Sequence, residues 1–340
     1  MIRLTLITFF IISSSLLFAQ TDSTQFFLQK GLTEKQNGRR MESLKNFEKA
    51  LKYDANNKAV LTELASAYLD LRKYFEAKTT YKKLVDLGDA SAANYKQLMQ
   101  LSFNFHQYND VVTYANSLKK IDPNEKLSYY LGKVYYEQED YGNGIKNLTV
   151  AATDDPKNAE VQFLLGRCYL NMQNFKQAMP FYLKAIELDS AKSEWIFELG
   201  MMCNAMYDNV NSLKYILLAG ERGYRRDNTY MENLGIAYLE AGEFDNGVAT
   251  LNELLQKRPT DANILSMLAE AYYDKKNYDE AINYWDKILQ TDKTNAKALY
   301  MIGMSFQKKG DKTKGQGLCD EAIKMDPSLA SLKRGQMSSF

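Results

Sequence analysis

The chain has 340 residues, of which 45% are hydrophobic and 25% charged, and its formal net charge at pH 7 is +1. This hydrophobic share can bury a large core, and five prolines with 18 dispersed glycines give no segment the composition of a disordered linker. A net charge near zero gives no broad electrostatic attraction to nucleic acid or anionic lipid, and we expect no nucleic-acid partner.

The beginning of the chain has the features of a secretory signal peptide. Arg3 is followed by an apolar stretch at residues 4–18, and Ala19 provides a cleavage position. The stretch is shorter than the roughly 20 residues of a membrane-spanning helix. We therefore expect a signal peptide at residues 1–19, cut after Ala19, and a periplasmic or secreted protein with no membrane span after cleavage. Retention of the segment as an uncleaved anchor is the alternative.

A repeat of about 34 residues follows a short mature segment at residues 20–23. Gly132, Gly166 and Gly200 lie 34 residues apart, each after a leucine, and the eighth position is small in eight of nine repeats. Position 20 is also small, and positions 11 and 24 are often aromatic. Residue types that recur at the same positions of successive repeats predict two helices per repeat that approach each other closely. The nine repeats are expected to start near residues 24, 58, 92, 125, 159, 193, 228, 262 and 296.

Prolines punctuate these repeats. Pro123, Pro156, Pro259 and Pro327 occupy position 32, where a proline ends one helix pair and suits the start of the next. Pro180 is expected near the start of a second helix, where backbone N–H groups lack partners. After the array ends at residue 329, residues 330–340 are expected to form a short C-terminal capping helix.

Two helix signatures resemble the tetratricopeptide repeat family. Phe47 to Leu51 (FEKAL) and Tyr182 to Ile186 (YLKAI) look like its second helix, and residues 129–135 (YYLGKVY) look like its first. The resemblance covers residues 24–329. It implies an all-α fold, a right-handed superhelical solenoid of about nine helix-turn-helix repeats.

Residues with catalytic potential are few. His106 is the one histidine and falls in a turn, which removes support for a Ser-His-Asp triad or a histidine-based zinc site. Cys168, Cys203 and Cys319 are odd in number and widely spaced, unlike a disulfide or zinc framework. The glycines of residues 310–317 lack the Lys-Ser/Thr of a phosphate loop. We expect no enzyme activity, cofactor, metal or small-molecule substrate.

The family resemblance implies that positions 2, 5, 9, 12 and 13 of each first helix face a partner in a concave groove. These positions hold an aromatic and cationic strip in repeats three to six and an acidic surface in repeats seven and eight, and aromatic and arginine side chains often anchor interfaces. The expected partner-binding residues are Lys96, Gln100, Tyr129, Lys133, Tyr136, Phe163, Arg167, Phe197, Met201, Glu232, Glu270 and Tyr273.

The sequence thus predicts a non-catalytic protein-protein interaction scaffold of the cell envelope that binds a protein or peptide segment in the groove. The alternative is a constitutive structural subunit of an envelope machine, in secretion, outer-membrane assembly or surface attachment, that uses its ends and convex face. The identity of the partner is not encoded in any motif.

Overall fold

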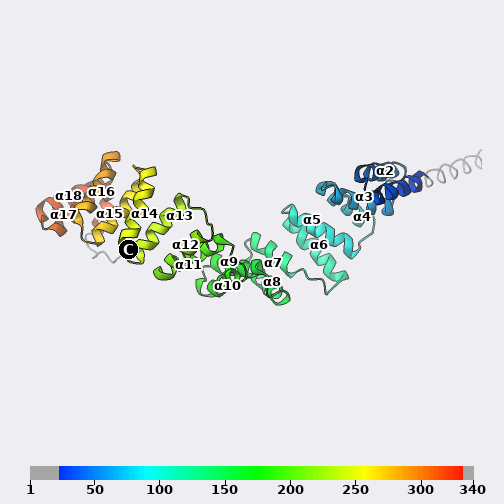
Figure 1. Ribbon diagram of the computed structural model, residues 1–340, viewed down its shortest axis with the longest axis horizontal. Helices are drawn as coiled ribbons and strands as arrows, with labels where there is room; N and C mark the ends of the chain where they lie inside the picture. The colour runs from blue at the N-terminus through cyan, green and yellow to red at the C-terminus, as the bar shows by residue number, and fades with distance from the viewer. Residues whose placement is uncertain (1–22, 332–340) are drawn as a thin grey trace, which may run out of the picture. The chain divides into compact units, whose positions relative to one another are not determined.

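The computed structural model describes residues 23–331, and every regular element in that range is a helix (Figure 1). The prediction of an all-α repeat fold is confirmed. The expected signal peptide at residues 1–19 lies outside the described residues, as do residues 332–340 of the expected capping helix. None of the described helices is long and apolar enough to cross a membrane.

The helices alternate between a first and a second helix of each repeat. The first helices are residues 23–36, α3 (Lys58–Asp70), α5 (Ala92–Asn104), α7 (Ser128–Glu137), α9 (Ala159–Asn171), α11 (Ser193–Ala205), α13 (Asn228–Glu240), α15 (Ala262–Asp274) and α17 (Ala296–Lys309). The second helices are α2 (Arg40–Tyr53), α4 (Tyr74–Asp86), α6 (Tyr108–Ile121), α8 (Tyr141–Asp154), α10 (Phe175–Leu188), α12 (Asn209–Glu221), α14 (Phe244–Lys257), α16 (Tyr278–Thr291) and α18 (Lys312–Met325).

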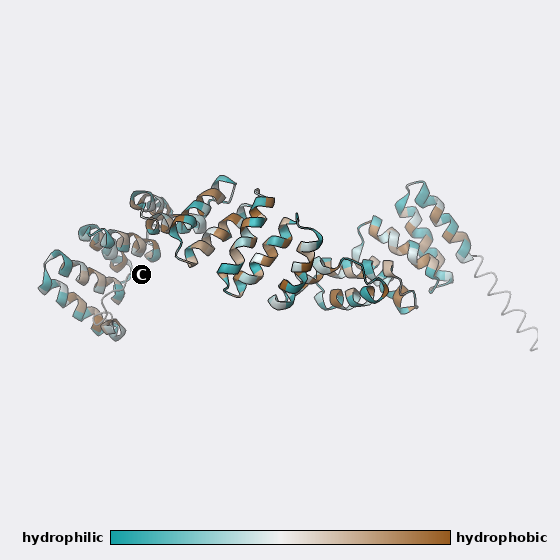
Figure 2. Cartoon of the chain, turned by 90° about the horizontal axis from the view of Figure 1, so that it is seen from below, coloured by the Kyte–Doolittle hydropathy of each residue, from teal (hydrophilic) through white to brown (hydrophobic). Residues whose placement is uncertain are grey.

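The chain divides into two compact units, an N-terminal unit (Met1–Met172) and a C-terminal unit (Gln173–Phe340). In each unit the hydrophobic residues form a stripe along every helix, with hydrophilic residues on the opposite side (Figure 2). A single helix pair cannot cover its own stripe, so each pair buries it against the next. In the C-terminal unit the buried residues join into one cluster from Ile196 to Leu329.

The small residues at positions 8 and 20 lie at the contact between the two helices of a repeat. In the first repeat Ser43 on α2 donates a hydrogen bond of 2.9 Å to the carbonyl of Gly31, and Phe47 lies against the same glycine. A Cβ atom on Gly31 would come within 2.4 Å of the Phe47 ring. The missing side chain is therefore what allows the aromatic residue of the second helix to reach the first.

Each turn between the two helices of a repeat contains one residue with positive φ: Gly38, Arg72, His106, Glu139, Gln173, Tyr207, Gly242, Lys276 and Gly310. A left-handed residue reverses the chain within three residues, so the repeat requires this conformation whichever residue occupies it. Three of the nine are glycine. The other six carry a Cβ atom that costs conformational energy in this region.

Replacing Tyr207 with glycine is expected to stabilise the protein by about 0.5–1 kcal/mol. The side chain is 89% exposed, so its removal loses little packing, whereas the strain at φ 58° is relieved. Denaturant unfolding followed by circular dichroism measures the change. Tyr207→Ala is the control, because alanine removes the ring but keeps the strain; an equal gain in both variants would contradict the explanation.

Pro180 lies elsewhere than expected, and a 3₁₀ helix at the end of the array includes the first residues of the capping helix expected at residues 330–340. Pro180 lies inside α10, five residues beyond its first residue Phe175, and not among the unpaired N–H groups at the start. It is exposed, so water can hydrogen-bond the carbonyl that loses its helical partner. At the other end of the array, Pro327–Ser331 forms a 3₁₀ helix whose Leu329 is buried against α18.

α7 begins later than the 34-residue spacing of the other first helices would place it. Its first residue is Ser128, 36 residues after the start of α5, although a repeat start near residue 125 was expected. Asn57, Ser91 and Asn158 each cap the following first helix through a side-chain oxygen, whereas Leu127 at the start of α7 has no such atom. The segment before α7 contains a turn at Pro123 and Asn124, and no residue from 122 to 127 is helical.

Candidate protein-binding surface

All twelve expected partner-binding residues lie on first helices. In the N-terminal unit Lys96 and Gln100 lie on α5, Tyr129, Lys133 and Tyr136 on α7, and Phe163 and Arg167 on α9. In the C-terminal unit Phe197 and Met201 lie on α11, Glu232 on α13, and Glu270 and Tyr273 on α15. The boundary between the units after Met172 divides them into two separate sets.

Glu160 on α9 is the centre of the set in the N-terminal unit. Its Oε2 accepts a hydrogen bond of 2.7 Å from the Tyr129 hydroxyl, and its Oε1 lies 2.7 Å from the Lys133 ammonium. Both partners come from α7, so one carboxylate joins two neighbouring first helices. Hydrogen bonds to a charged acceptor are among the stronger ones in proteins. The carboxylate therefore fixes two groove side chains in one arrangement.

Lys133 also lies over two aromatic rings. Its Nζ is 5.7 Å from the ring centre of Phe103 on α5 and 5.9 Å from that of Tyr129. Burial raises the pKa of Tyr129 to about 12, helped by its hydrogen bond to Glu160. Burial by itself would lower the pKa of Lys133, but the hydrogen bond to Glu160 and the nearby charges raise it. Lys133 therefore remains charged at neutral pH.

Arg167 forms a second aromatic contact one turn along α9. Its guanidinium lies 5.5 Å from the ring centre of Tyr136 and 5.6 Å from that of Phe163. Phe163 is 8% exposed, so its ring packs against the Arg167 side chain and offers little accessible area to a partner. Tyr136 is only half-buried and remains accessible beside the guanidinium.

Lys96 and Gln100 extend the surface onto α5. The Lys96 ammonium is 2.7 Å from a carboxylate oxygen of Glu125, which raises the pKa of the lysine through the hydrogen bond and the charge. Gln100 is partly exposed, one turn further along the helix. The predicted cations of this unit are thus held by carboxylates or rings of the neighbouring repeat, and they are presented in fixed positions.

Glu160 is the residue that the sequence interpretation missed. It occupies position 2 of the fifth repeat, one of the positions assigned to the groove, but a strip of aromatic and cationic residues gave no reason to include an acid. The repeat positions could have indicated this contact, because the residue at position 2 of one repeat lies close to the residues at positions 5 and 9 of the preceding repeat.

In the C-terminal unit two of the expected aromatic residues are buried. Phe197, 8% exposed, stacks on Tyr224 with ring centres 4.4 Å apart. Tyr224 belongs to the turn between α12 and α13, in a repeat of 35 residues between the starts of α11 and α13, and Phe197 packs that turn against α11. Tyr273, 9% exposed, makes an edge contact with Trp285 at 5.8 Å. Both side chains contribute more to packing than to accessible surface.

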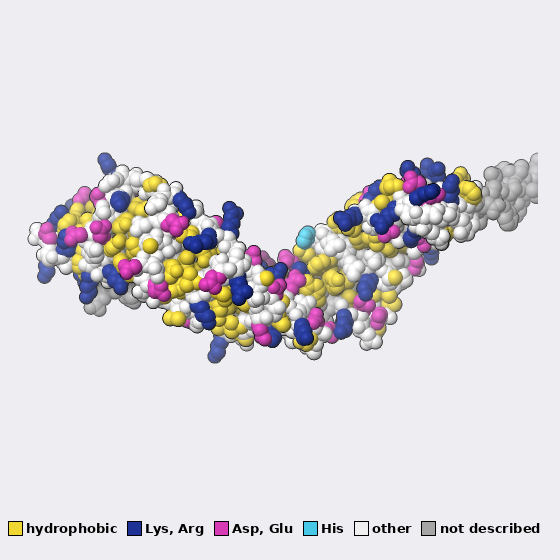
Figure 3. Space-filling view, viewed as in Figure 1, with side chains coloured by type: hydrophobic (Ala, Val, Ile, Leu, Met, Phe, Trp, Pro, Cys, Tyr) yellow, Lys and Arg dark blue, Asp and Glu magenta, His cyan; other side chains and the backbone are white. Residues whose placement is uncertain are grey.

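The same unit carries an acidic surface on α13 and α15. Burial raises the pKa of Glu240, and burial together with the charge of Glu270 raises that of Asp274. Glu270 accepts from Ser266 and lies 3.3 Å from the Lys297 ammonium. Glu232 on α13 is partly exposed, as is Met201 on α11. Figure 3 shows charged side chains of both signs dispersed over one face of the unit, with hydrophobic ones gathered around α11 and α12.

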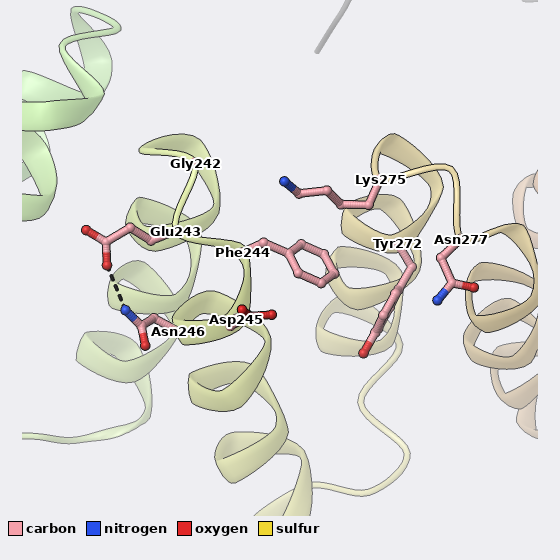
Figure 4. A pocket seen from close by; sticks show the side chains of 8 residues that line it. All are labelled: Gly242, Glu243, Phe244, Asp245, Asn246, Tyr272, Lys275 and Asn277. Carbon is pink, nitrogen blue, oxygen red and sulfur yellow. Dashed lines mark hydrogen bonds between the residues drawn. The ribbon is translucent and has the colours of Figure 1, made fainter.

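A crevice opens at the helix turns of the C-terminal unit (Figure 4). It has a volume of about 630 Å³, and its lining residues are Gly242, Glu243, Phe244, Asp245, Asn246, Tyr272, Lys275 and Asn277. The Lys275 ammonium lies 5.4 Å from the centre of the Phe244 ring, which makes an edge contact with Tyr272 at 5.2 Å. A crevice of about 410 Å³ lies at the corresponding turns of the N-terminal unit, around Tyr108. The shape therefore follows from the stacking of repeats.

The residues that the sequence singled out for possible chemistry lie far from one another in the chain, in exposed turns or in the core. No group of three or more histidine, cysteine or acidic residues within residues 23–331 could hold a metal ion. His106 lies in an exposed turn, where its ring nitrogen is 2.9 Å from the Tyr108 hydroxyl. Cys168 and Cys203 are buried, and burial raises the pKa of each thiol to about 11, which disfavours the nucleophilic thiolate.

Models of one family match most of the array. Three models described as tetratricopeptide repeat match residues 28–94, residues 135–195 and 238–303, and residues 296–329. The matches fall in both units and together extend over more than half of the chain.

Curated relatives share the repeats over part of their length. A DnaJ protein P58IPK homolog B of Oryza sativa subsp. japonica is 27% identical over 56% of this chain and 44% of its own length. The peroxisomal targeting signal receptor of Saccharomyces cerevisiae is 24% identical over 49% of this chain and 29% of its own. The chain spans less than half the length of each of these relatives.

Solved structures with similar folds include YrrB, described as a TPR protein with an unusual peptide-binding site, and PilW, described as a type IV pilus biogenesis factor. YrrB is 18% identical, with 55% of this chain and 97% of YrrB covered and a TM-score of 0.44. PilW is 18% identical, with 62% and 94% covered and a TM-score of 0.43.

Proposed function

Because the chain belongs to the tetratricopeptide repeat family, we propose that it is a non-catalytic interaction scaffold of the cell envelope. It binds a protein or peptide segment along the face of its first helices. The envelope location rests on the apolar segment at residues 4–18, which resembles a signal peptide. A relative that is named a targeting signal receptor is in keeping with capture of a peptide by such repeats.

The network around Glu160 is the observation that carries this proposal. Tyr129, Lys133 and Arg167 are held by contacts between neighbouring first helices, whereas side chains on an unused solvent face are usually mobile. Rings and cations fixed before binding lose less entropy when a partner arrives. The N-terminal unit therefore offers a preordered surface of Tyr129, Tyr136, Lys133 and Arg167.

The test is photo-crosslinking in cells with the probe at Gln100 on α5. This position is partly exposed and makes no contact that the network needs. The control probe goes at Lys146, an exposed residue on the second helix α8 of the same unit. One dominant adduct from Gln100 alone, named by mass spectrometry, supports the groove. Adducts from Lys146 alone, or from neither position, would contradict it.

Combining Arg167→Glu with Tyr136→Ala is expected to weaken capture of that adduct partner by at least about tenfold. The double change removes the guanidinium and the accessible ring that lies 5.5 Å from it, which together form one anchor. Pull-down with the purified partner measures the loss. A melting temperature near that of the wild type must accompany it, since unchanged capture by a folded double variant would reject the assignment.

A second candidate function is a structural subunit that uses its turns and second helices. The observation in its favour is a pair of highly exposed apolar residues in the C-terminal unit, Tyr207 at 89% and Val210 at 73%. Both lie where α11 turns into α12, away from the first-helix face. A further probe at Val210 that gives adducts, with none from Gln100, would favour this alternative.

A further inference from the structure

The second helix of the first repeat has a lysine-rich outer face. Met41, Lys45, Lys49 and Lys52 are spaced by four, four and three residues, which places them on one side of α2, and all four are exposed. The buried residues of the helix, including Leu44 and Phe47, lie on the other side. The stripe therefore faces away from the core.

Aromatic rings continue this stripe. Lys49 lies over the ring of Phe27 at 5.8 Å, and the same ring stacks on Tyr53 at 5.7 Å. Phe26 makes an edge contact with Phe27 at 5.2 Å and is itself 61% exposed. We call these residues, with Met41, Lys45 and Lys52, the aromatic-lysine patch. Exposure of an apolar ring to water is unfavourable. A phenylalanine exposed beside lysines therefore indicates a surface that contacts an apolar partner.

The charge around the patch is locally positive although the whole chain is nearly neutral. Residues 23–57 contain seven lysines and arginines but four acidic residues. Glu34 is paired with Arg39. Glu42 and Glu48 flank the lysines of α2, and Glu48 accepts a hydrogen bond from Tyr68 on α3. Figure 3 shows lysine and arginine side chains gathered over α2 and α3.

We propose that the aromatic-lysine patch rests on the surface of a bilayer that contains anionic lipids. Lysines beside exposed aromatic and aliphatic side chains combine electrostatic attraction to lipid headgroups with burial of apolar surface. Lipid contact by the first repeat leaves the first-helix face of later repeats available.

The test is co-sedimentation of the chain from Gln20 onward, which includes every described helix, with lipid vesicles. Binding is expected with vesicles of phosphatidylcholine containing about 30% phosphatidylglycerol, and not with pure phosphatidylcholine. About 0.5 M salt should release most of the protein. Lys45→Gln, Lys49→Gln and Lys52→Gln combined should weaken binding about a hundredfold, since each lysine contributes roughly fivefold at an anionic surface.

The matched control combines Lys308→Gln, Lys312→Gln and Lys324→Gln, which makes the same change of net charge at exposed positions of the last repeat. It should bind the vesicles like the wild type. Phe26→Ala should weaken binding severalfold without altering the salt dependence, because the ring contributes only apolar contact. Absence of binding to anionic vesicles, or equal loss in both triple variants, would overturn the proposal, as would capture of an acidic protein by the patch without vesicle binding.

Discussion

Replacing Gly315 with alanine is expected to lower the free energy of unfolding by about 2 kcal/mol. This glycine and Gly303 mark the closest approach of α17 and α18. A Cβ atom on Gly315 would lie 2.5 Å from the carbonyl oxygen of Gly303 and 2.7 Å from the backbone nitrogen of Gln307. Backbone atoms cannot move aside like the end of a flexible side chain. The two helices would have to separate, which exposes the core around Cys319.

Gly317 on the same helix provides the matched control. A Cβ atom there would meet no atom within 4 Å, so Gly317→Ala should stabilise α18 by about 1 kcal/mol through helix propensity alone. Denaturant unfolding gives the two free energies, and hydrogen exchange locates the change. In the Gly315 variant, exchange should accelerate first in α17 and α18, because repeats are coupled mainly to their neighbours. Equal effects at the two glycines would refute the close-approach explanation.

The sequence predicted the fold well because its determinants are periodic. The columns that hold Gly303 and Gly315 require small residues for the reason the structure shows, a backbone contact between two helices. A pattern that recurs in nine repeats is visible without tertiary information. The late start of α7 was not predictable in this way, because Asn124 offers a capping oxygen at the expected start, yet the helix begins at Ser128.

The candidate site was less predictable because position in a repeat does not determine which residues a side chain contacts. Phe163 and Phe197 occupy the same position of successive repeats and are both 8% exposed, yet their rings contact different residues. Phe163 supports Arg167, whereas Phe197 packs the turn that contains Tyr224. That turn lies in a repeat one residue longer than the 34-residue period, and its effect on a neighbouring helix is a tertiary contact. Residue type and spacing alone carry no information on it.

Replacing Glu160 with glutamine is expected to leave the Lys133 and Tyr129 side chains of the N-terminal unit less firmly held in position. Glutamine keeps the shape and can still accept from Tyr129, but it has no charge with which to hold Lys133. The pKa of Tyr129, about 12 in the wild type, should fall while staying above 10, because burial is the larger cause of its elevation. Stability should decrease by about 1 kcal/mol, a modest value because the ion pair is partly exposed.

The same tyrosine gives the protein an alkaline pH dependence. Its folded-state pKa of about 12 lies above the unfolded value of 10.0, so the folded protein holds the phenolic proton more tightly. This contribution to stability is complete below pH 10 and is lost as the pH rises through about 12. The difference in phenolate absorbance between the wild type and Tyr129→Phe isolates the titration of this one tyrosine.

Glu125→Gln is the control for the Glu160 variant. Glu125 also pairs with a lysine of the preceding first helix, Lys96, at 2.7 Å, but it contacts no tyrosine hydroxyl. Its replacement should leave the Tyr129 titration unchanged. If capture of the groove partner falls in Glu160→Gln and not in Glu125→Gln, the fixed positions of Tyr129 and Lys133 matter for binding, beyond the loss of one negative charge. An unchanged Tyr129 titration in Glu160→Gln would mean that burial alone sets its pKa, and the preordered surface would lose its central contact.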